Sequence, residues 1–281
     1  ARLKVSFREL QLKINSRFYT YCGFVCIRFP MLGCCCCLPS SRSLDPATST
    51  PIEEFRTEEL PRRVLKTVVF QGSARDVVPP WGGDSRLGDR VLKHVLQVLA
   101  DRRADLAGET ISHSVTVFDP VEVFGPAGPL EGDGALKHPH FFLAPEDERR
   151  RKMDSMATAV KEADAYLVVS PEYNHTIPPA LSSMMDHFGG SNFARKASAI
   201  VTYSVGPWAG VRSSVELQPF LHELGCLPVS KMTSFPSASD IFHEDGTPKD
   251  PEHRMLKQLP AMIADLEWVA TALAKMKAAS G

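Results

Sequence analysis

From about residue 64 onward, short apolar runs alternate with longer segments in which apolar residues recur every three or four positions. The short runs predict buried strands, and the longer segments predict helices with one apolar face. In residues 87–103, for example, Val91, Val95 and Val98 stand at helical spacing. Strands that alternate with helices of this length indicate an α/β fold, with a parallel sheet covered by helices on both faces.

The expected elements follow one another along the chain. Strands are predicted at residues 64–72, 111–120, 165–171, 197–204 and 227–235. Helices are predicted at residues 87–103, 145–164, 210–225 and 251–279. Pro260 is expected to kink or divide the last helix. Ligands of such folds bind at the carboxyl ends of the strands, so the residues directly after each strand are the candidates for function.

The loop after the first predicted strand has residues suited to a phosphate. Gly72 permits a tight exit from the strand, and Ser73 and the backbone amides can meet an anion. Arg75 and Arg86 bracket the loop, and the next helix adds the positive end of its dipole. The loop has neither a Walker pattern nor G-x-G-x-x-G. A surface turn with two solvated arginines would show the same pattern, so both interpretations stay open.

The loop after the third predicted strand reads Ser-Pro-Glu-Tyr-Asn-His-Thr. Pro171 stiffens the strand exit, which then presents Glu172, Tyr173, Asn174 and His175. A planar aromatic ligand could lie against this loop and meet backbone groups at its polar edge. The alternative is that Tyr173 is a core aromatic and Glu172 a solvated acid.

The loop after the fourth predicted strand combines small residues with one large ring. Gly206, Ala209 and Gly210 let the backbone approach a flat ligand closely, and Trp208 offers a stacking face. A turn with one exposed Trp is the alternative. The shared position of the three loops at strand ends favours one common site.

Composition narrows the functional class. The 281 residues carry a net charge of −1, which excludes bulk electrostatic binding of nucleic acid. Six of the seven cysteines lie within the first forty residues, so the main body is typical of a reducing compartment, and a cytoplasmic location is expected. No metal site is expected.

Residues 1–60 differ from residues 61–281, which form the predicted α/β domain. The first part is basic and poor in acids, and its apolar run is interrupted by Arg28 and Pro30, so each half is too short to span a bilayer. Four interpretations stay open: an organelle transit peptide, S-acylation of Cys34–Cys37, a zinc site (disfavoured by four consecutive thiols), and a poorly ordered extension. The chain begins with Ala, which indicates a fragment or a processed product.

Three motifs in order resemble the NADPH-dependent FMN reductase family, which includes quinone, chromate and azo reductases. They are Gly72-Ser73-Ala74-Arg75, Pro171-Glu172-Tyr173-Asn174, and the turn from Ser204 to Gly210. The resemblance covers about residues 64–273. It implies a flavodoxin-like, doubly wound, five-stranded parallel sheet with strand order 2-1-3-4-5 and helices on both faces.

The resemblance also implies where FMN binds. Ser73 and Arg75, with Ser85 or Arg86, would hold its phosphate. The isoalloxazine ring would lie along residues 171–174, and its pyrimidine side would meet the third loop. The ring-binding residues implied are Pro171, Glu172, Tyr173, Asn174, Ser204, Gly206 and Gly210. The chain departs from the family in an insertion at residues 76–84 and in Ala209, which replaces a Gly.

The activity implied is hydride transfer from NAD(P)H to FMN, followed by reduction of a quinone-like or other small acceptor with ping-pong kinetics. Tyr173 or His175 could donate a proton, unless both are structural. Two alternatives are an FMN-binding electron-transfer module and a member that has lost its flavin. A homodimer or homotetramer is expected, with the helix of residues 179–188 as its contact.

Overall fold

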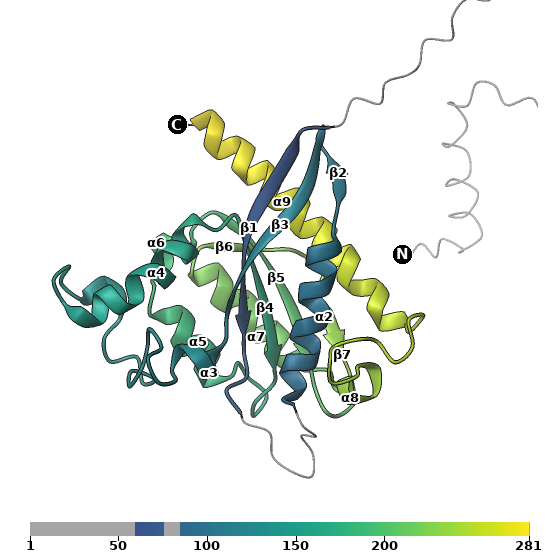
Figure 1. The fold of residues 1–281 in the computed structure, drawn as a ribbon, viewed down its shortest axis with the longest axis horizontal. Coiled ribbons are helices and arrows are strands. Elements are labelled where there is room, and N and C mark those ends of the chain that lie inside the picture. Colours follow the sequence, from purple (N-terminus) through teal and green to yellow (C-terminus); the bar gives the residue numbers. More distant parts are fainter. Residues whose placement is uncertain (1–59, 76–84, 281) are drawn as a thin grey trace, which may run out of the picture. The chain divides into compact units, whose positions relative to one another are not determined.

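The computed structural model describes residues 60–75 and 85–280, which form one sheet with helices on both faces (Figure 1). The long apolar runs became strands because their β-branched and aromatic residues pack on a pleated surface. The strands are β1 (Arg62–Gln71), β2 (Ala104–Leu106), β3 (Glu109–Phe118), β4 (Ala165–Pro171), β5 (Lys196–Tyr203), β6 (Cys226–Pro228) and β7 (Thr233–Phe235).

The helices include both long amphipathic segments and single turns. The α-helices are α2 (Leu87–Asp101), α3 (Pro120–Val123), α4 (Glu148–Glu162), α5 (Pro179–Asp186), α6 (Gly190–Phe193), α7 (Val211–Glu223), α8 (Ala238–Ile241) and α9 (Gln258–Ser280). Two 3₁₀ turns are η1 (His140–Phe142) and η2 (Arg254–Lys257). Pro260 lies in the first turn of α9, where its missing N–H removes no intrahelical bond, so the helix starts there instead of being kinked.

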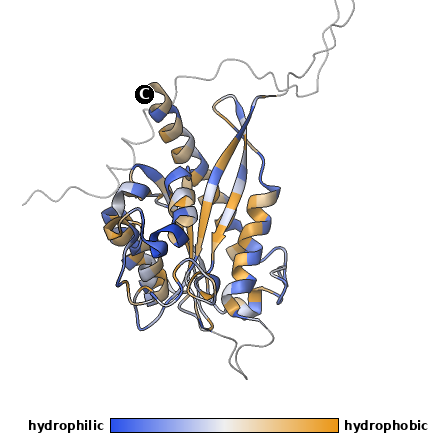
Figure 2. Ribbon diagram, turned by 60° about the vertical axis from the view of Figure 1, so that its left-hand side comes forward, coloured by the Kyte–Doolittle hydropathy of each residue, from blue (hydrophilic) through white to orange (hydrophobic). Residues whose placement is uncertain are grey.

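Successive residues of each central strand point to opposite faces of the sheet, and each face has its own apolar core. On β1, Leu65 and Val69 pack with α2 and α9, whereas Val68 and Phe70 pack with α4, α5 and α7. Figure 2 shows the apolar strands enclosed between the helices. Because both faces are covered, the ligand-accessible part of the sheet is its edge of strand ends.

Within residues 60–75 and 85–280 the sheet has seven strands, in the order β2-β3-β1-β4-β5-β6 with β7 also paired to β5. The predicted count of five strands is therefore wrong, and the predicted order 2-1-3-4-5 omits two features. The first is β2, a three-residue antiparallel edge strand that joins β3 through a turn at Ala107 and Gly108, both with positive φ. The second is a break in the last predicted strand: β6 pairs with the start of β5 and β7 with its end.

Several sequence predictions lie outside the described residues. They concern residues 1–59, including the cysteine run, and the insertion at 76–84. Among the helices that the structure describes, none is long and apolar enough to cross a membrane. Cys226, the cysteine of the described part, is a buried free thiol.

A buried polar network links the two outer elements α2 and α9 to the sheet. Arg102 donates to both carboxylate oxygens of Glu267, at 2.9 and 2.8 Å. The ring of His113 lies 3.3 Å from Glu267 Oε1 and 2.9 Å from Thr67 Oγ1. Burial by itself would raise the pKa of the Glu267 carboxyl, but the hydrogen bonds from His113 and Arg102 outweigh it and hold the pKa below its ordinary value.

Replacing Glu267 by Gln should lower the free energy of unfolding at pH 7 by about 2–3 kcal/mol, because Arg102 loses its buried counter-charge. The pKa of Glu267 is lower in the folded than in the unfolded chain, so its contribution is complete above the unfolded pKa and is lost as the pH falls through the folded pKa. Urea unfolding at several pH values measures both effects. Glu162→Gln, in an exposed pair with Lys66, is the control and should be nearly neutral. A deficit that persists undiminished in strong acid contradicts the assignment.

Candidate functional site

The three candidate loops leave the sheet side by side. Gln71 of β1 pairs with Val169 of β4, and Pro171 of β4 pairs with Tyr203 of β5. Parallel strands in this register end at one edge, which lies at the lower side of Figure 1, where α2 begins. The register therefore brings together residues that are about a hundred positions apart in the chain.

The second loop is a tight two-residue turn. Tyr173 and Thr176 exchange backbone hydrogen bonds of 3.1 and 3.0 Å, and Asn174 and His175 between them have φ values of 50° and 67°. Asn tolerates this left-handed region, but for His it is unfavourable. Both side chains are exposed at the tip of the turn.

Glu172 connects the second loop to the helix that follows the third. Its Oε2 accepts from the backbone N–H of Arg212 at 3.0 Å, and its Oε1 lies 3.0 Å from Arg212 Nη1. Arg212 is in the first turn of α7, so the carboxylate both caps that helix and forms an ion pair with it. The Glu172 side chain is thus neither solvated nor free to act as an acid.

Tyr173 connects the second loop to the first. Its hydroxyl lies 2.7 Å from Ser73 Oγ, and the guanidinium carbon of Arg75 is 3.9 Å from the centre of its ring. Arg75 has no acidic partner among the described residues. The three side chains form one contact group at the strand edge.

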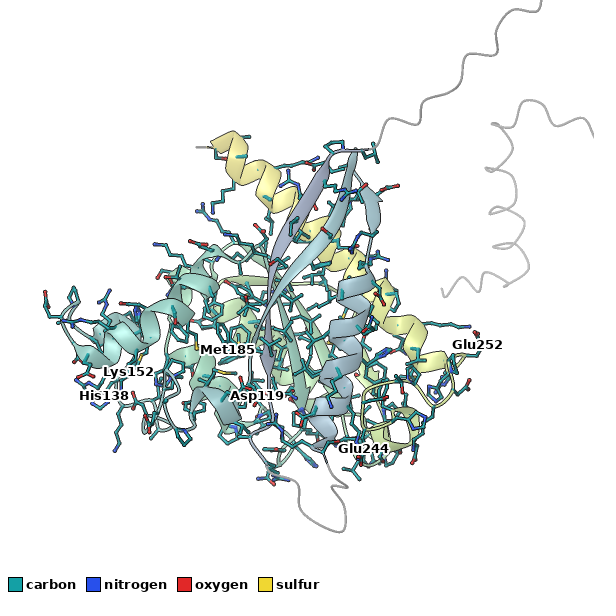
Figure 3. All side chains as sticks on the ribbon, viewed as in Figure 1. Asp119, His138, Lys152, Met185, Glu244 and Glu252 are labelled. Carbon is teal, nitrogen blue, oxygen red and sulfur yellow. The ribbon has the colours of Figure 1, made fainter. Side chains whose placement is uncertain are left out.

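Arg86 lies beside the same loop, but its guanidinium is engaged within the protein. Its Nη1 donates to the Ser73 carbonyl at 2.9 Å and to Asp119, its Nη2 also binds Asp119, and its Nε donates to Asp89 at 3.1 Å. Burial alone would lower the pKa of Arg86, but Asp119 and Asp89 raise it strongly. Asp119 directly follows β3 at the same sheet edge (Figure 3). Arg86 therefore supports the backbone of the first loop.

Three buried polar groups near the start of α2 have no hydrogen-bond partner that the structure describes. They are Ser85 Oγ, Gln71 Nε2 and the Tyr203 hydroxyl. The first turn of α2 also has no side-chain cap. Buried polar groups normally find a partner, so these atoms have hydrogen-bonding capacity left for a polar ligand group. With the helix dipole and Arg75, the surroundings favour an anion.

Backbone hydrogen bonds from the start of α8 hold the third loop in place. The N–H groups of Ser237 and Ala238 donate to the carbonyls of Gly206 and Ser204 at 2.8 and 2.9 Å. Gly210, with φ of 73°, starts α7 and lies against the backbone of β5. Gly206 has no atom within 4 Å of where its Cβ would lie. The loop thus leaves open backbone beside the second loop.

Sequence reasoning missed several residues that shape this edge. Asp119 and Arg212 hold Arg86 and Glu172, and Tyr203 ends β5 beneath α2. Asp119 could have been found, because it lies at the carboxyl end of the strand predicted at residues 111–120.

The proposed oligomer contact needs correction: the apolar side chains of residues 179–188 form no exposed surface. Leu181, Met184, Met185 and Phe188 are all fully buried in the core of their own chain.

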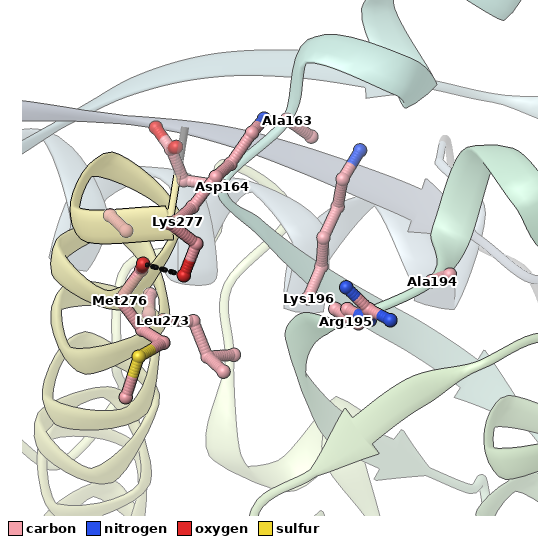
Figure 4. Close-up of a pocket in the computed structure, with 11 residues that line it drawn as sticks. Ala163, Asp164, Ala194, Arg195, Lys196, Leu273, Met276 and Lys277 are labelled. Atoms are coloured by element: carbon pink, nitrogen blue, oxygen red, sulfur yellow. Dashed lines mark hydrogen bonds between the residues drawn. The ribbon is translucent and has the colours of Figure 1, made fainter.

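A separate cavity of about 410 Å³ lies at the opposite edge, beside the amino ends of β4 and β5 (Figure 4). Lys196 Nζ donates there to the carbonyls of Val160 and Asn192, at 2.8 and 2.9 Å. Burial, and then repulsion from Lys277, lowers the pKa of Lys196 to about 8. None of the candidate residues lines this cavity, and the half-buried Lys196 is engaged by backbone carbonyls.

The fold and the three strand-end loops are those of an α/β protein of the flavodoxin-like class. The model of the NADPH-dependent FMN reductase family matches residues 65–240, more than half of the chain. The chain belongs to this family, and FMN and NADPH are the cofactors that the family's name gives.

Individual relatives are distant. Over 85 residues the chain is 28% identical to the NADH:(hydroxy)cinnamate reductase subunit CrdA of Vibrio ruber, a match that covers 30% of this chain and 42% of that protein. The flavoenzyme NAD(P)H:(acceptor) oxidoreductase FerB of Paracoccus denitrificans has a similar structure, with a TM-score of 0.50, 18% identity, and coverage of 74% and 98% of the two chains. An oxidoreductase of Corynebacterium diphtheriae gives the same TM-score and coverage at 13% identity. These structural likenesses concern the fold alone.

The residues at the strand edge fit FMN. The unpartnered Ser85 hydroxyl, the uncapped start of α2 and Arg75 suit its phosphate, and the open backbone at Gly206 suits a flat ring. Bound FMN supplies the two-electron chemistry, and the protein binds and orients it.

Replacing Gly88 by Ala should disturb this edge. The added Cβ would lie 2.3 Å from the Tyr203 hydroxyl oxygen and 2.7 Å from Gln71 Nε2, so α2 or the Tyr203 ring must move. We expect the free energy of unfolding to fall by about 1–3 kcal/mol in urea titrations of the flavin-free protein. Gly206→Ala is the matched control and should leave it unchanged, because nothing lies near that Cβ. Equal stability of the two variants would show that α2 does not pack on Tyr203 as described.

Proposed function

We propose that the protein is an NAD(P)H-dependent reductase that passes two electrons from bound FMN to a quinone-like or other small oxidised acceptor. The observation that carries this proposal is the convergence of unpartnered hydroxyls, Arg75 and the start of α2 at the strand edge of an FMN reductase fold. The name of the FerB flavoenzyme, NAD(P)H:(acceptor) oxidoreductase, is in keeping with this proposal.

The chain's residues divide into binding and supporting groups. Ser73, Arg75 and Ser85 would hold the phosphate, while Arg86 would keep the Ser73 backbone in place. The ring would lie between the second and third loops, against backbone of residues 171–174 and of Ser204, Gly206 and Gly210. Glu172 would contribute backbone only, since its carboxylate binds Arg212.

In the net reaction, NAD(P)H gives up a hydride, and with one proton it converts a quinone to the hydroquinone, leaving NAD(P)⁺. The nicotinamide and the acceptor would use one open face in turn, which gives ping-pong kinetics. The exposed His175 could deliver a proton to the acceptor, whereas the Tyr173 hydroxyl is engaged with Ser73. We place the domain in a reducing compartment, the cytoplasm or an organelle reached through the basic N-terminal segment.

An oligomer would use an apolar stripe beside the third loop. Val211 and Val215 are one turn apart on α7 and exposed, with Trp208 and Val205 before them. Trp208 is 65% and Val215 62% exposed. We propose that this stripe is the contact of a homodimer or homotetramer.

An absorbance spectrum of the purified chain, repeated after anaerobic addition of NADPH, tests the reductase function. Flavin bands near ~450 nm that bleach with NADPH are expected, because the cofactor accepts hydride directly. Bands that persist would favour an electron-transfer module instead. Failure to bind added FMN would contradict the site itself, and the insertion at 76–84 would then be the first region to remove.

Replacing Val215 by Glu should shift the oligomer towards monomer, because it places a charge on the apolar stripe. Sedimentation velocity at micromolar concentration measures the change. Glu216→Gln, the adjacent exposed position, is the control and should not alter the assembly. A monomeric wild-type protein, or a variant that assembles normally, would contradict the proposed contact.

A further inference from the structure

Tyr173 makes two contacts across loops that are a hundred residues apart in the sequence. Its hydroxyl lies 2.7 Å from Ser73 Oγ, and its ring lies 3.9 Å beneath the guanidinium carbon of Arg75. One side chain of the second loop therefore touches both Ser73 and Arg75, the two first-loop residues proposed to hold the phosphate.

Arg75 needs such a support more than Arg86 does. Arg86 is fixed by Asp119, Asp89 and the Ser73 carbonyl. Arg75 is exposed and has no acidic partner among the described residues, so without the ring its long side chain would sample many rotamers. Stacking on an aromatic face restricts a guanidinium while its N–H edge stays available for a phosphate, because the two interactions use different parts of the group.

We propose that Tyr173 is a positioning residue for the phosphate of FMN. Its ring holds Arg75, its hydroxyl orients Ser73, and the protein thereby distinguishes FMN from riboflavin, which lacks the phosphate. This inference rests on the proposed function, which puts the phosphate at the first loop. It gives Tyr173 a task different from proton donation, and it makes the second loop a determinant of cofactor choice.

Flavin titrations of the full 281-residue chain test the proposal. Dissociation constants for FMN and for riboflavin are measured separately by fluorescence quenching in the wild type, Tyr173→Leu and Tyr173→Phe. Tyr173→Leu should weaken FMN by roughly 3- to 30-fold and riboflavin by less than about 2-fold, because the lost contacts, the ring beneath Arg75 and the hydroxyl at Ser73, both support groups that bind the phosphate. Tyr173→Phe keeps the ring and should lose only about 2- to 5-fold, for FMN alone.

A double-mutant cycle distinguishes positioning from direct contact with the ring. In an Arg75→Ala background, Tyr173→Leu should weaken FMN no more than Tyr173→Phe does, about 2- to 5-fold, since the guanidinium that the ring holds is gone and only the hydroxyl contact with Ser73 is left to lose. Additive losses, or equal losses of FMN and riboflavin, would overturn the proposal. If Tyr173→Leu does not fold, as judged by thermal unfolding, Tyr173→Phe in a Ser73→Ala background applies the same test to the hydroxyl.

Flavin binding by the wild-type chain distinguishes a failure of the proposed function from a failure of the role of Tyr173. A wild-type chain that binds neither flavin contradicts the proposed function, and this inference with it. A wild-type chain that binds FMN and riboflavin equally well contradicts the role of Tyr173 while leaving the reductase function intact.

Discussion

The hydrogen-bonded register of the parallel strands β1, β4 and β5 decides where every candidate residue lies. The second half of β1 and nearly all of β4 and β5 are buried on both faces, and a slip of one residue would turn their apolar side chains to the wrong core. The same register fixes the level at which the strands end. The three loops meet because the cores on either face of the sheet allow only this alignment.

The loops are then held to one another by side chains rather than by backbone alone. Tyr173 joins the second loop to the first, Glu172 joins it to the start of α7, and Arg86 ties the first loop to the end of β3. The second loop therefore contacts the elements on both sides of it and holds them in place. Its two-residue turn, with His175 in an unfavourable region, persists because its neighbours over-determine it.

Much of this arrangement could be read from the sequence. The apolar runs located the main strands, and the rule that ligands bind at strand ends selected the loops. What could not be read were contacts between distant positions: nothing local shows that Glu172 pairs with Arg212, or that Arg86 faces Asp119. The edge strand β2 was missed because its three residues are too few to show the alternation of apolar and polar side chains that predicts a strand. The break between β6 and β7 was missed because apolar residues recur throughout residues 227–235, which predicts a single strand. The buried Met184 and Met185 show the converse error, since apolar spacing on a helix does not tell which partner it packs against.

The pairing of Glu172 with the first turn of α7 affects how substitutions at this site should be interpreted. A carboxylate in a loop at the proposed cofactor site invites the role of acid or base. Here its removal would free the start of a helix and release the third loop from the second, so activity would fall through geometry. Reduced turnover in a Glu172 variant would therefore carry no information on proton transfer. Such a variant would bind FMN more weakly, and the pH dependence of its activity would be unchanged.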